Sequence, residues 1–260
     1  MIKNETRSIC LADGKRNLQF WTPPGCSRLT PIVLLHDSLG SVGLWRQFPA
    51  QLASFLNRTV IAYDRLGYGD SDVNPIPLKK TFIEDEVLHF VELKKAIGVE
   101  QVVLLGHSVG GSMAVCIAAD DPQVVGVITV SSQAFVEDRT IYGIKRAKDS
   151  FGDQNQFAKL VRWHGAKATW VLHAWTETWL KPSFADWRLD PWLQRMTCPV
   201  LVIHGSDDEF GSEAFPQTIA TQSAGPSEMV LLQGCGHRPF KEQPNDVMEA
   251  IKLFLAKYQL

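Results

Sequence analysis

The sequence lacks any apolar run long enough to cross a membrane. Its longest hydrophobic stretches fall far short of the roughly 18 residues that a transmembrane helix needs. The first ten residues, MIKNETRSIC, are polar and hold no apolar core of the kind found in secretory signals. We therefore expect a cytoplasmic protein that does not bind membranes.

The sequence also lacks paired cysteine motifs and an excess of one charge. The 26 Lys and Arg residues nearly balance the 28 Asp and Glu residues, and no Lys/Arg cluster occurs along the chain. Nucleic acid is therefore not an expected partner. Scattered cysteines without C-x-x-C spacing predict reduced thiols, not a zinc site or a disulfide framework. These cysteines are Cys10, Cys26, Cys116, Cys198 and Cys235. The sequence indicates no oligomeric state.

Near-continuous apolar runs, rich in Val and Ile, indicate strands that are buried on both faces of a parallel sheet. The runs are PIVLLH (31–36), TVIAYD (59–64), QVVLLG (101–106), VVGVITV (124–130), PVLVIH (199–204) and EMVLLQ (228–233). Ahead of them, TRSIC and NLQFW flank ADGK and predict an opening hairpin. Helical patterns separate the strands, which predicts an α/β fold with helices on both faces of a mostly parallel sheet. The predicted helices lie at 44–56, 82–97, 112–120 and 246–258.

One stretch breaks the alternation of strands and helices. About 65 residues between VITVSS and CPVLVIH have a helical texture and no strand. A crossover between parallel strands needs only about a dozen residues. We therefore expect a helical cap at residues 134–195, inserted into a core domain made of residues 1–133 and 196–260.

Six of the eight tryptophans fall within this expected cap, at positions 163, 170, 175, 179, 187 and 192. Trp175 and Trp179 are four residues apart and share one face of a helix. Binding pockets are mostly hydrophobic with few polar groups. We expect at least one or two of these tryptophans to line such a pocket and others to hold the cap to the core.

The sequence GHSVG sets Ser108 between two glycines, directly after a predicted strand and before a predicted helix. A serine hydroxyl needs an exposed position and a base to act as a nucleophile. A sharp strand-to-helix turn supplies the position, but the residues two places away must then be small, as Gly106 and Gly110 are. The pattern G-x-S-x-G therefore predicts a nucleophile at Ser108, with the N–H of Val109 directed towards a bound carbonyl.

A base and an acid are expected further along the chain. His237 lies in GCGHRPF, after the last predicted strand, where a loop with two glycines can return over the carboxyl edge of the sheet. Asp207 and Asp208 follow the strand PVLVIH, and either carboxylate could hold the imidazole in the required tautomer. The chain order Ser, Asp, His is that of hydrolases with a nucleophile at such a turn.

Five motifs in this order resemble those of the α/β-hydrolase superfamily, over nearly the whole chain. They are HDSLGS, DRLGYGDS, GHSVGG, HGSDDEF and GHRPFKEQP. The resemblance implies an α/β-hydrolase fold and a serine hydrolase that needs no metal or organic cofactor. The family pattern H-G-x-x-D places the acid at Asp208, with Asp207 as a turn residue, and the family's base position falls on His237. It also implies an oxyanion hole formed by the backbone N–H groups of Ser38 and Val109.

The sequence departs from the family pattern at Asp37, where glycine is usual. The stretch HDSLG is similar to the NSLG of 3-oxoadipate enol-lactonases. Asp tolerates a left-handed backbone better than most residues, so the turn can survive. We expect Asp37 to stabilise its loop or to contact substrate, and His107 is a second candidate contact. Arg238 is expected to pair with Glu242, with binding of a substrate carboxylate as the alternative.

The sequence thus predicts hydrolysis of a small-to-medium carboxylic ester or lactone by Ser108, His237 and Asp208, through an acyl-enzyme. Carbon–carbon bond hydrolysis of ring-cleavage products, thioester hydrolysis and a lyase reaction remain alternatives on the same residues. Relatives that cleave carbon–carbon bonds usually carry Asn before the nucleophile and an aromatic residue after the base, where this chain has His107 and Arg238. A ligand-binding receptor with little turnover is a further alternative. The presence of all three residues, Ser108, Asp208 and His237, argues against it.

Overall fold

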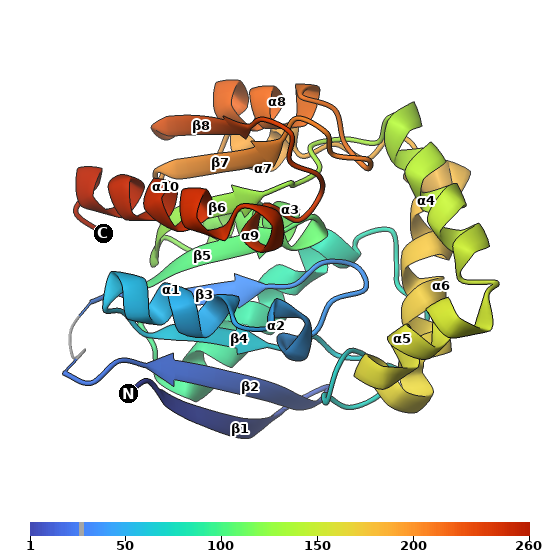
Figure 1. Ribbon diagram of the computed structural model, residues 1–260, viewed down its shortest axis with the longest axis horizontal. Coiled ribbons are helices and arrows are strands. Elements are labelled where there is room, and N and C mark those ends of the chain that lie inside the picture. The colour runs from blue at the N-terminus through green and yellow to red at the C-terminus, as the bar shows by residue number, and fades with distance from the viewer. Residues whose placement is uncertain (26–28) are drawn as a thin grey trace.

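A twisted eight-stranded sheet forms the centre of the computed structural model, which describes residues 1–25 and 29–260 (Figure 1). The strand order is β1-β2-β4-β3-β5-β6-β7-β8, and only the pairs β1–β2 and β2–β4 are antiparallel. The strands are β1 (Lys3–Leu11), β2 (Gly14–Thr22), β3 (Ile32–Leu35), β4 (Val60–Tyr63), β5 (Val102–His107), β6 (Val124–Val130), β7 (Val200–Gly205) and β8 (Ser227–Leu232). The structure thereby confirms the predicted fold class, the opening hairpin and all six parallel strands.

Helices cover both faces of the sheet and bury two apolar layers (Figure 1). Every residue of β3, β4, β5 and β7 is buried, as the uninterrupted apolar runs predict for strands covered on both sides. One face carries α1 (Phe48–Leu56), α9 (Pro239–Glu242) and α10 (Pro244–Lys257). The other face carries α2 (Phe82–Ile97), α3 (Val109–Asp120) and α8 (Ala214–Gln222).

Three helices begin at other places than the sequence predicts. The helix expected at 246–258 begins two residues earlier, at Pro244 of α10. The helix expected at 44–56 is divided into the short 3-10 helix η1 (Val42–Trp45) and α1, because Arg46 between them has a φ of 57° and cannot continue a helix. Helix α3 begins at Val109, three residues before the predicted start, because the chain passes from β5 into the helix through the single residue Ser108.

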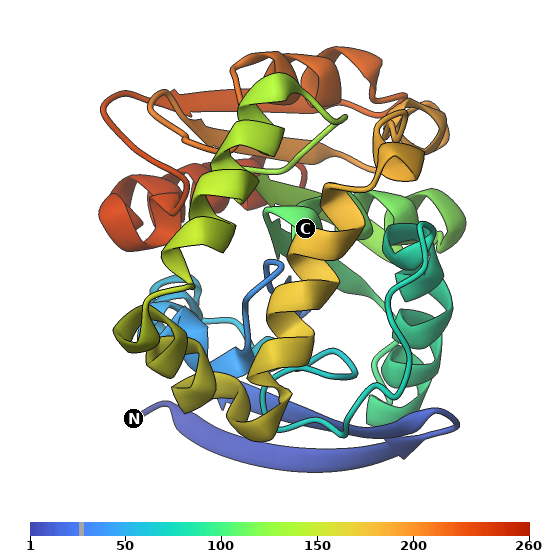
Figure 2. The ribbon, with the colours of Figure 1, turned by 90° about the vertical axis from the view of Figure 1, so that its right-hand side faces the viewer.

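Between β6 and β7 the chain forms a group of helices at the carboxyl ends of the strands (Figures 1 and 2). We call residues 134–195 the inserted segment. Its helices are α4 (Asp138–Ser150), α5 (Gln154–His164), η2 (Gly165–Lys167), α6 (Ala168–Trp179), η3 (Pro182–Phe184) and α7 (Asp190–Leu193). Its final part packs into the core, because Leu189 and Leu193 are fully buried in the same apolar cluster as α2 and α3.

A buried histidine ties the inserted segment to the core. His164, at the end of α5, accepts a hydrogen bond from the Gly69 N–H at Nδ1, over 3.0 Å. Its Nε2 lies 3.0 Å from the carbonyl oxygen of Leu39. Because Nδ1 accepts, the proton is assigned to Nε2, which donates to that carbonyl. Burial lowers the pKa of His164, which favours this neutral form.

Two tryptophans of the inserted segment have the docking role expected from the sequence. Trp170 donates from its indole N–H to the carbonyl of Ile76 at 3.1 Å, and its ring packs on Gly67, where any side chain would collide with it. Trp187 donates to the carboxylate of Glu84 on α2 at 3.2 Å. Both contacts join the segment to the core.

Cys10, Cys116, Cys198 and Cys235 carry free thiols, and Cys26 lies outside the described residues. Within residues 1–25 and 29–260, no helix combines the length and the hydropathy that a membrane span requires.

Candidate active site

Ser108 occupies a strained turn between β5 and α3. Its φ of 55° and ψ of −129° cost a non-glycine residue about 1–3 kcal/mol. A side chain on Gly106 would collide with the backbone of Gly110, and a side chain on Gly110 would collide with the carbonyl of Leu35. The two glycines therefore allow β5 to turn directly into α3, which leaves Ser108 at the tip.

His237 is held by a buried carboxylate. Its Nδ1 lies 2.9 Å from both carboxylate oxygens of Asp208, which follows β7 and also accepts the N–H of Phe210 at 2.8 Å. Burial opposes ionisation of both groups, but their mutual attraction and hydrogen bond outweigh it. The pKa of Asp208 is therefore lowered and the pKa of His237 is raised. Asp207, the other candidate acid, is exposed and bonds to the Ser206 hydroxyl.

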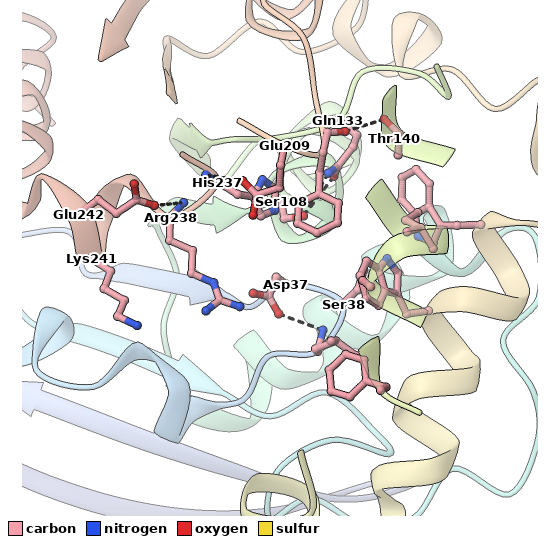
Figure 3. A pocket seen from close by; sticks show the side chains of 17 residues that line it. Asp37, Ser38, Ser108, Gln133, Thr140, Glu209, His237, Arg238, Lys241 and Glu242 are labelled. Atoms are coloured by element: carbon pink, nitrogen blue, oxygen red, sulfur yellow. Dashed lines mark hydrogen bonds between the residues drawn. The ribbon is translucent and has the colours of Figure 1, made fainter. Parts of the chain in front are cut away.

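A cavity of about 500 Å³ brings these side chains together between the sheet edge and the inserted segment (Figure 3). Polar groups from the core line one part, namely Asp37, Ser38, Ser108, Gln133 and His237. Apolar groups line another part, namely Leu39, Ile144, Ala147, Phe151, Trp175, Trp179 and Phe210. Charged residues, namely Glu209, Arg238, Lys241 and Glu242, together with Thr140, complete the lining.

The hydroxyl of Ser108 is hydrogen-bonded to Gln133. The amide nitrogen Nε2 of Gln133 lies 3.1 Å from Oγ, and the amide oxygen lies 3.4 Å from it. Among the described residues, no hydrogen bond joins Ser108 to the His237 ring, although both line the cavity. Hydrogen bonds of this kind are often long without substrate and tighten when it binds. The shorter contact assigns Nε2 as a donor to Oγ, which leaves the hydroxyl proton free for another acceptor.

Gln133 was missed at the sequence level. The stretch TVSSQAF after β6 contains no carboxylate, and a lone amide has no spacing pattern that marks it. The residue is buried, and its backbone carbonyl is fixed by the Ser112 hydroxyl at 2.8 Å.

Replacing Gln133 by methionine is expected to lower kcat for hydrolysis about tenfold, because one hydrogen bond to Ser108 Oγ is lost. Methionine has a similar length and cannot donate a hydrogen bond. The measurement is kcat and KM, together with the rate of inactivation by a fluorophosphonate. Gln217→Met on the exposed face of α8 is the matched control. Equal kcat values in Gln133→Met and the wild type would contradict this role.

Two backbone N–H groups near Ser108 are available to a ligand. Neither the Ser38 N–H nor the Val109 N–H donates to another of the described residues. Val109 is the first residue of α3, where N–H groups have no partner within the helix and the helix dipole favours negative charge. The guanidinium of Arg65 donates to the carbonyl of Asp37 at 2.7 Å, which steadies the loop that carries Ser38.

Asp37 is paired with His107. Its Oδ2 lies 3.2 Å from Nδ1 of His107, and Nε2 of His107 lies 2.8 Å from the carbonyl oxygen of His237. Both ring nitrogens thus face acceptors. Burial has the largest effect on the pKa of His107 and lowers it, and although these two hydrogen bonds raise it, the net shift is downward. Burial also disfavours the Asp37 anion, but the bond to His107 outweighs it and holds the pKa of Asp37 well below its usual range.

The expected contacts of the site are placed as follows. Asp37, Trp175 and Trp179 line the cavity, whereas His107 is buried beneath it and lines a neighbouring cavity. Among residues 1–25 and 29–260, no group of three or more His, Cys, Asp or Glu side chains is arranged to hold a metal ion.

The predicted ion pair between Arg238 and Glu242 is wrong. The Glu242 carboxylate accepts the backbone N–H groups of Arg238 at 3.0 Å and Gly236 at 2.8 Å, because both point towards it from the turn before α9. Within the described part of the chain, the guanidinium of Arg238 has no carboxylate at ion-pair distance. Figure 3 shows it extending from the His237 loop towards Asp37.

Known proteins share this architecture. Residues 32–250 match the sequence profile of the Alpha/beta hydrolase family. Proline iminopeptidase of Lactobacillus crispatus is 23% identical over 89% of this chain and 92% of its own length. The human 1-acylglycerol-3-phosphate O-acyltransferase ABHD5 is 34% identical over 43% of this chain. That match spans 32% of the human protein, about a third of its length.

Solved structures give the same result for the fold. The enol-lactonase from Burkholderia xenovorans has a TM-score of 0.74 at 18% identity, covering 96% of this chain and 100% of that one. An esterase from Thermogutta terrifontis has a TM-score of 0.72 at 22% identity, covering 98% and 100%. Since the family profile matches most of the sequence, the chain belongs to the alpha/beta hydrolase family of enzymes.

Proposed function

We propose that the protein is a serine hydrolase that cleaves a small-to-medium carboxylic ester or lactone through an acyl-enzyme on Ser108. One observation carries the proposal: a single cavity is lined by Ser108 at its strained turn and by His237, which Asp208 holds at Nδ1. A nucleophile, a base and a group that orients the base are the parts that acyl transfer requires.

In the proposed reaction, Ser108 Oγ attacks the substrate carbonyl and its proton passes to Nε2 of His237. The imidazolium then gives this proton to the leaving alcohol, and water repeats the attack on the acyl-enzyme. Asp208 keeps the second ring proton on Nδ1 and stabilises the imidazolium. For the first step the hydroxyl proton turns towards His237 while the amide of Gln133 continues to donate to Oγ.

The free N–H groups of Ser38 and Val109 form the proposed oxyanion hole. A donor of this kind is worth about 3–4 kcal/mol in the transition state. Asp37 would oppose negative charge there if it stood alone. Its hydrogen bond to His107 and the positive charge of the nearby Arg238 guanidinium offset that charge, so the departure from the usual glycine is compatible with oxyanion binding.

The size and lining of the cavity support the proposed substrate class. A volume of about 500 Å³ lies within the range of pockets for small ligands. We propose residues 134–195 as a cap domain on a core of residues 1–133 and 196–260, and Trp175 and Trp179 of this cap as contacts for the apolar part of the substrate. The fold is shared with an enol-lactonase and an esterase, which accords with this choice.

A fluorophosphonate probe tests the proposal directly, because it phosphonylates an activated serine. We expect stoichiometric labelling that peptide mapping assigns to Ser108 and that Ser108→Ala abolishes. Ser38→Ala is the matched control, since Ser38 lines the same cavity but is proposed to act through its backbone N–H only. Labelling that persists in Ser108→Ala would contradict the proposal.

The substrate class is tested with p-nitrophenyl esters, lactones, acyl-CoA thioesters and vinylogous diketones. We expect esters or lactones to give the highest kcat/KM. Turnover of the diketones alone would replace ester hydrolysis by carbon–carbon bond hydrolysis on the same residues.

A further inference from the structure

A second cavity, of about 600 Å³, adjoins the first. Asp37, Leu39, Phe151, Arg238 and Lys241 line both cavities, so these residues form the boundary between them. Ser108 and His237 line only the first cavity. The two cavities therefore lie side by side at the proposed catalytic serine's end of the sheet.

The lining of the second cavity is strongly basic. Five cationic side chains contribute to it, namely Arg46, Lys159, Arg162, Arg238 and Lys241. Asp37 is the single acidic residue among the described residues of this lining, and it is already paired with His107. Within the described part of the chain, none of the five cations has a carboxylate at ion-pair distance. The cavity thus carries an excess of positive charge that the protein does not neutralise.

The five cations come from three distant parts of the chain. Arg46 lies between η1 and α1, whereas Lys159 and Arg162 are three residues apart on α5 and share one helix face. Arg238 and Lys241 come from the loop of the proposed base and from α9. Like charges repel, so their convergence around one cavity raises the free energy of the protein without a ligand.

An aromatic ring holds two of these cations in place. The guanidinium carbon of Arg46 lies 4.3 Å from the ring centroid of Trp163, and that of Arg162 lies 5.4 Å from it. The ring lies so close to Gly43 that a Cβ there would come within 2.8 Å of it. Arg46 itself has a φ of 57° and a ψ of −125°, a conformation that non-glycine residues rarely adopt. These guanidinium groups are therefore oriented before any ligand arrives.

We propose that the second cavity binds a phosphate group of the substrate, whose apolar part lies in the first cavity. This inference rests on the proposed ester hydrolysis and narrows its substrate class to phosphate-bearing esters. A single guanidinium satisfies a carboxylate by a bidentate contact. Five unpaired cations around about 600 Å³ match a group with more oxygens and more negative charge.

Three hexanoate esters that differ only in the alcohol test the proposal. The alcohols are 2-hydroxyethyl phosphate, glycolate and the neutral 2-methoxyethanol. We expect the phosphate ester to have the highest kcat/KM in the wild type, through a lower KM, and this advantage to shrink as salt is added. The glycolate ester separates phosphate recognition from recognition of any anion.

The double substitution Lys159→Ala and Arg162→Ala is the test variant, because both residues are exposed on α5 and alanine favours the helix. We expect it to lower the ratio of kcat/KM for the phosphate ester to that for the neutral ester about tenfold. Lys145→Ala with Arg146→Ala on α4 removes the same charge from exposed positions outside both cavities and should leave the ratio unchanged.

Failure of this inference can be told apart from failure of the proposed function. Equal kcat/KM values for the phosphate and neutral esters, or a preference for the glycolate ester, would overturn phosphate recognition while ester hydrolysis stands. An unchanged ratio in the α5 variant would do the same. Absence of both ester turnover and fluorophosphonate labelling would overturn the proposed function and this inference with it.

Discussion

Replacing Ser108 by alanine is expected to lower kcat for ester hydrolysis by about 10⁶-fold. The cavity offers no equivalent hydroxyl among its described lining residues. Thr140 donates its hydroxyl to the carbonyl of Phe210 at 2.7 Å, and Ser38 lies on a different loop from the turn that Gly106 and Gly110 support. A residual rate above that in water should remain, because the oxyanion hole and the binding surface are intact.

The experiment measures kcat and KM for the best ester of the panel in the wild type, Ser108→Ala and Ser38→Ala. The alanine at position 108 has the same backbone strain as the serine, so circular dichroism and the melting temperature should change little. We expect Ser38→Ala to stay near the wild-type rate. Turnover by Ser108→Ala at a rate comparable to the wild type would mean that another group performs the attack.

Replacing Asp208 by asparagine is expected to lower kcat about 10⁴-fold. The asparagine amide can donate to Nδ1 of His237, which favours the tautomer with its proton on Nε2, where the base must accept. The substitution also removes the negative charge that raises the pKa of His237, while the burial that lowers it remains. Both effects act through His237, so KM should change much less than kcat.

The pH dependence of kcat/KM should shift in a definite direction when Asp208 is replaced by asparagine. Ester hydrolysis needs the neutral form of His237, so activity falls as pH drops through the pKa of that residue. In the wild type the pKa is raised, which places the acidic limb of kcat/KM above the ordinary value of 6.5. In Asp208→Asn the limb should move to lower pH, and an unmoved limb would contradict the assigned pair. Asp207→Asn is the matched control, because its carboxylate is exposed and does not contact His237.

The sequence predicts the core of the fold and two of the proposed catalytic residues, Ser108 and His237, from local patterns, and the resemblance to the family adds Asp208. Short, uninterrupted apolar runs are typical of strands that are covered on both faces of a sheet. All six runs are strands in the structure. The glycines around Ser108 mark the turn by their own spacing. Asp208 and His237 each follow a predicted strand, so the topology alone brings them to the same edge of the sheet.

Other features of the site depend on packing between distant segments and leave no local pattern. Gln133 reaches Ser108 only because of the path of the loop after β6. The five cations of the second cavity are scattered along a nearly neutral sequence, and only the placement of α5 against the core gathers them. The error on Glu242 has a similar cause, since its carboxylate was expected to meet a cation four residues earlier but instead accepts two backbone N–H groups.

The contacts at the turn of Ser108 have a consequence for how such an enzyme can diversify. The backbone of Ser108, the proposed nucleophile, is fixed by close main-chain contacts between neighbouring segments, with glycine where they meet. The apolar wall opposite it is made largely of side chains on α4 and α6. Substitutions in these helices can change which substrates bind while the positions of the proposed catalytic residues stay the same. Selection can therefore act on preference and on reactivity separately within one chain.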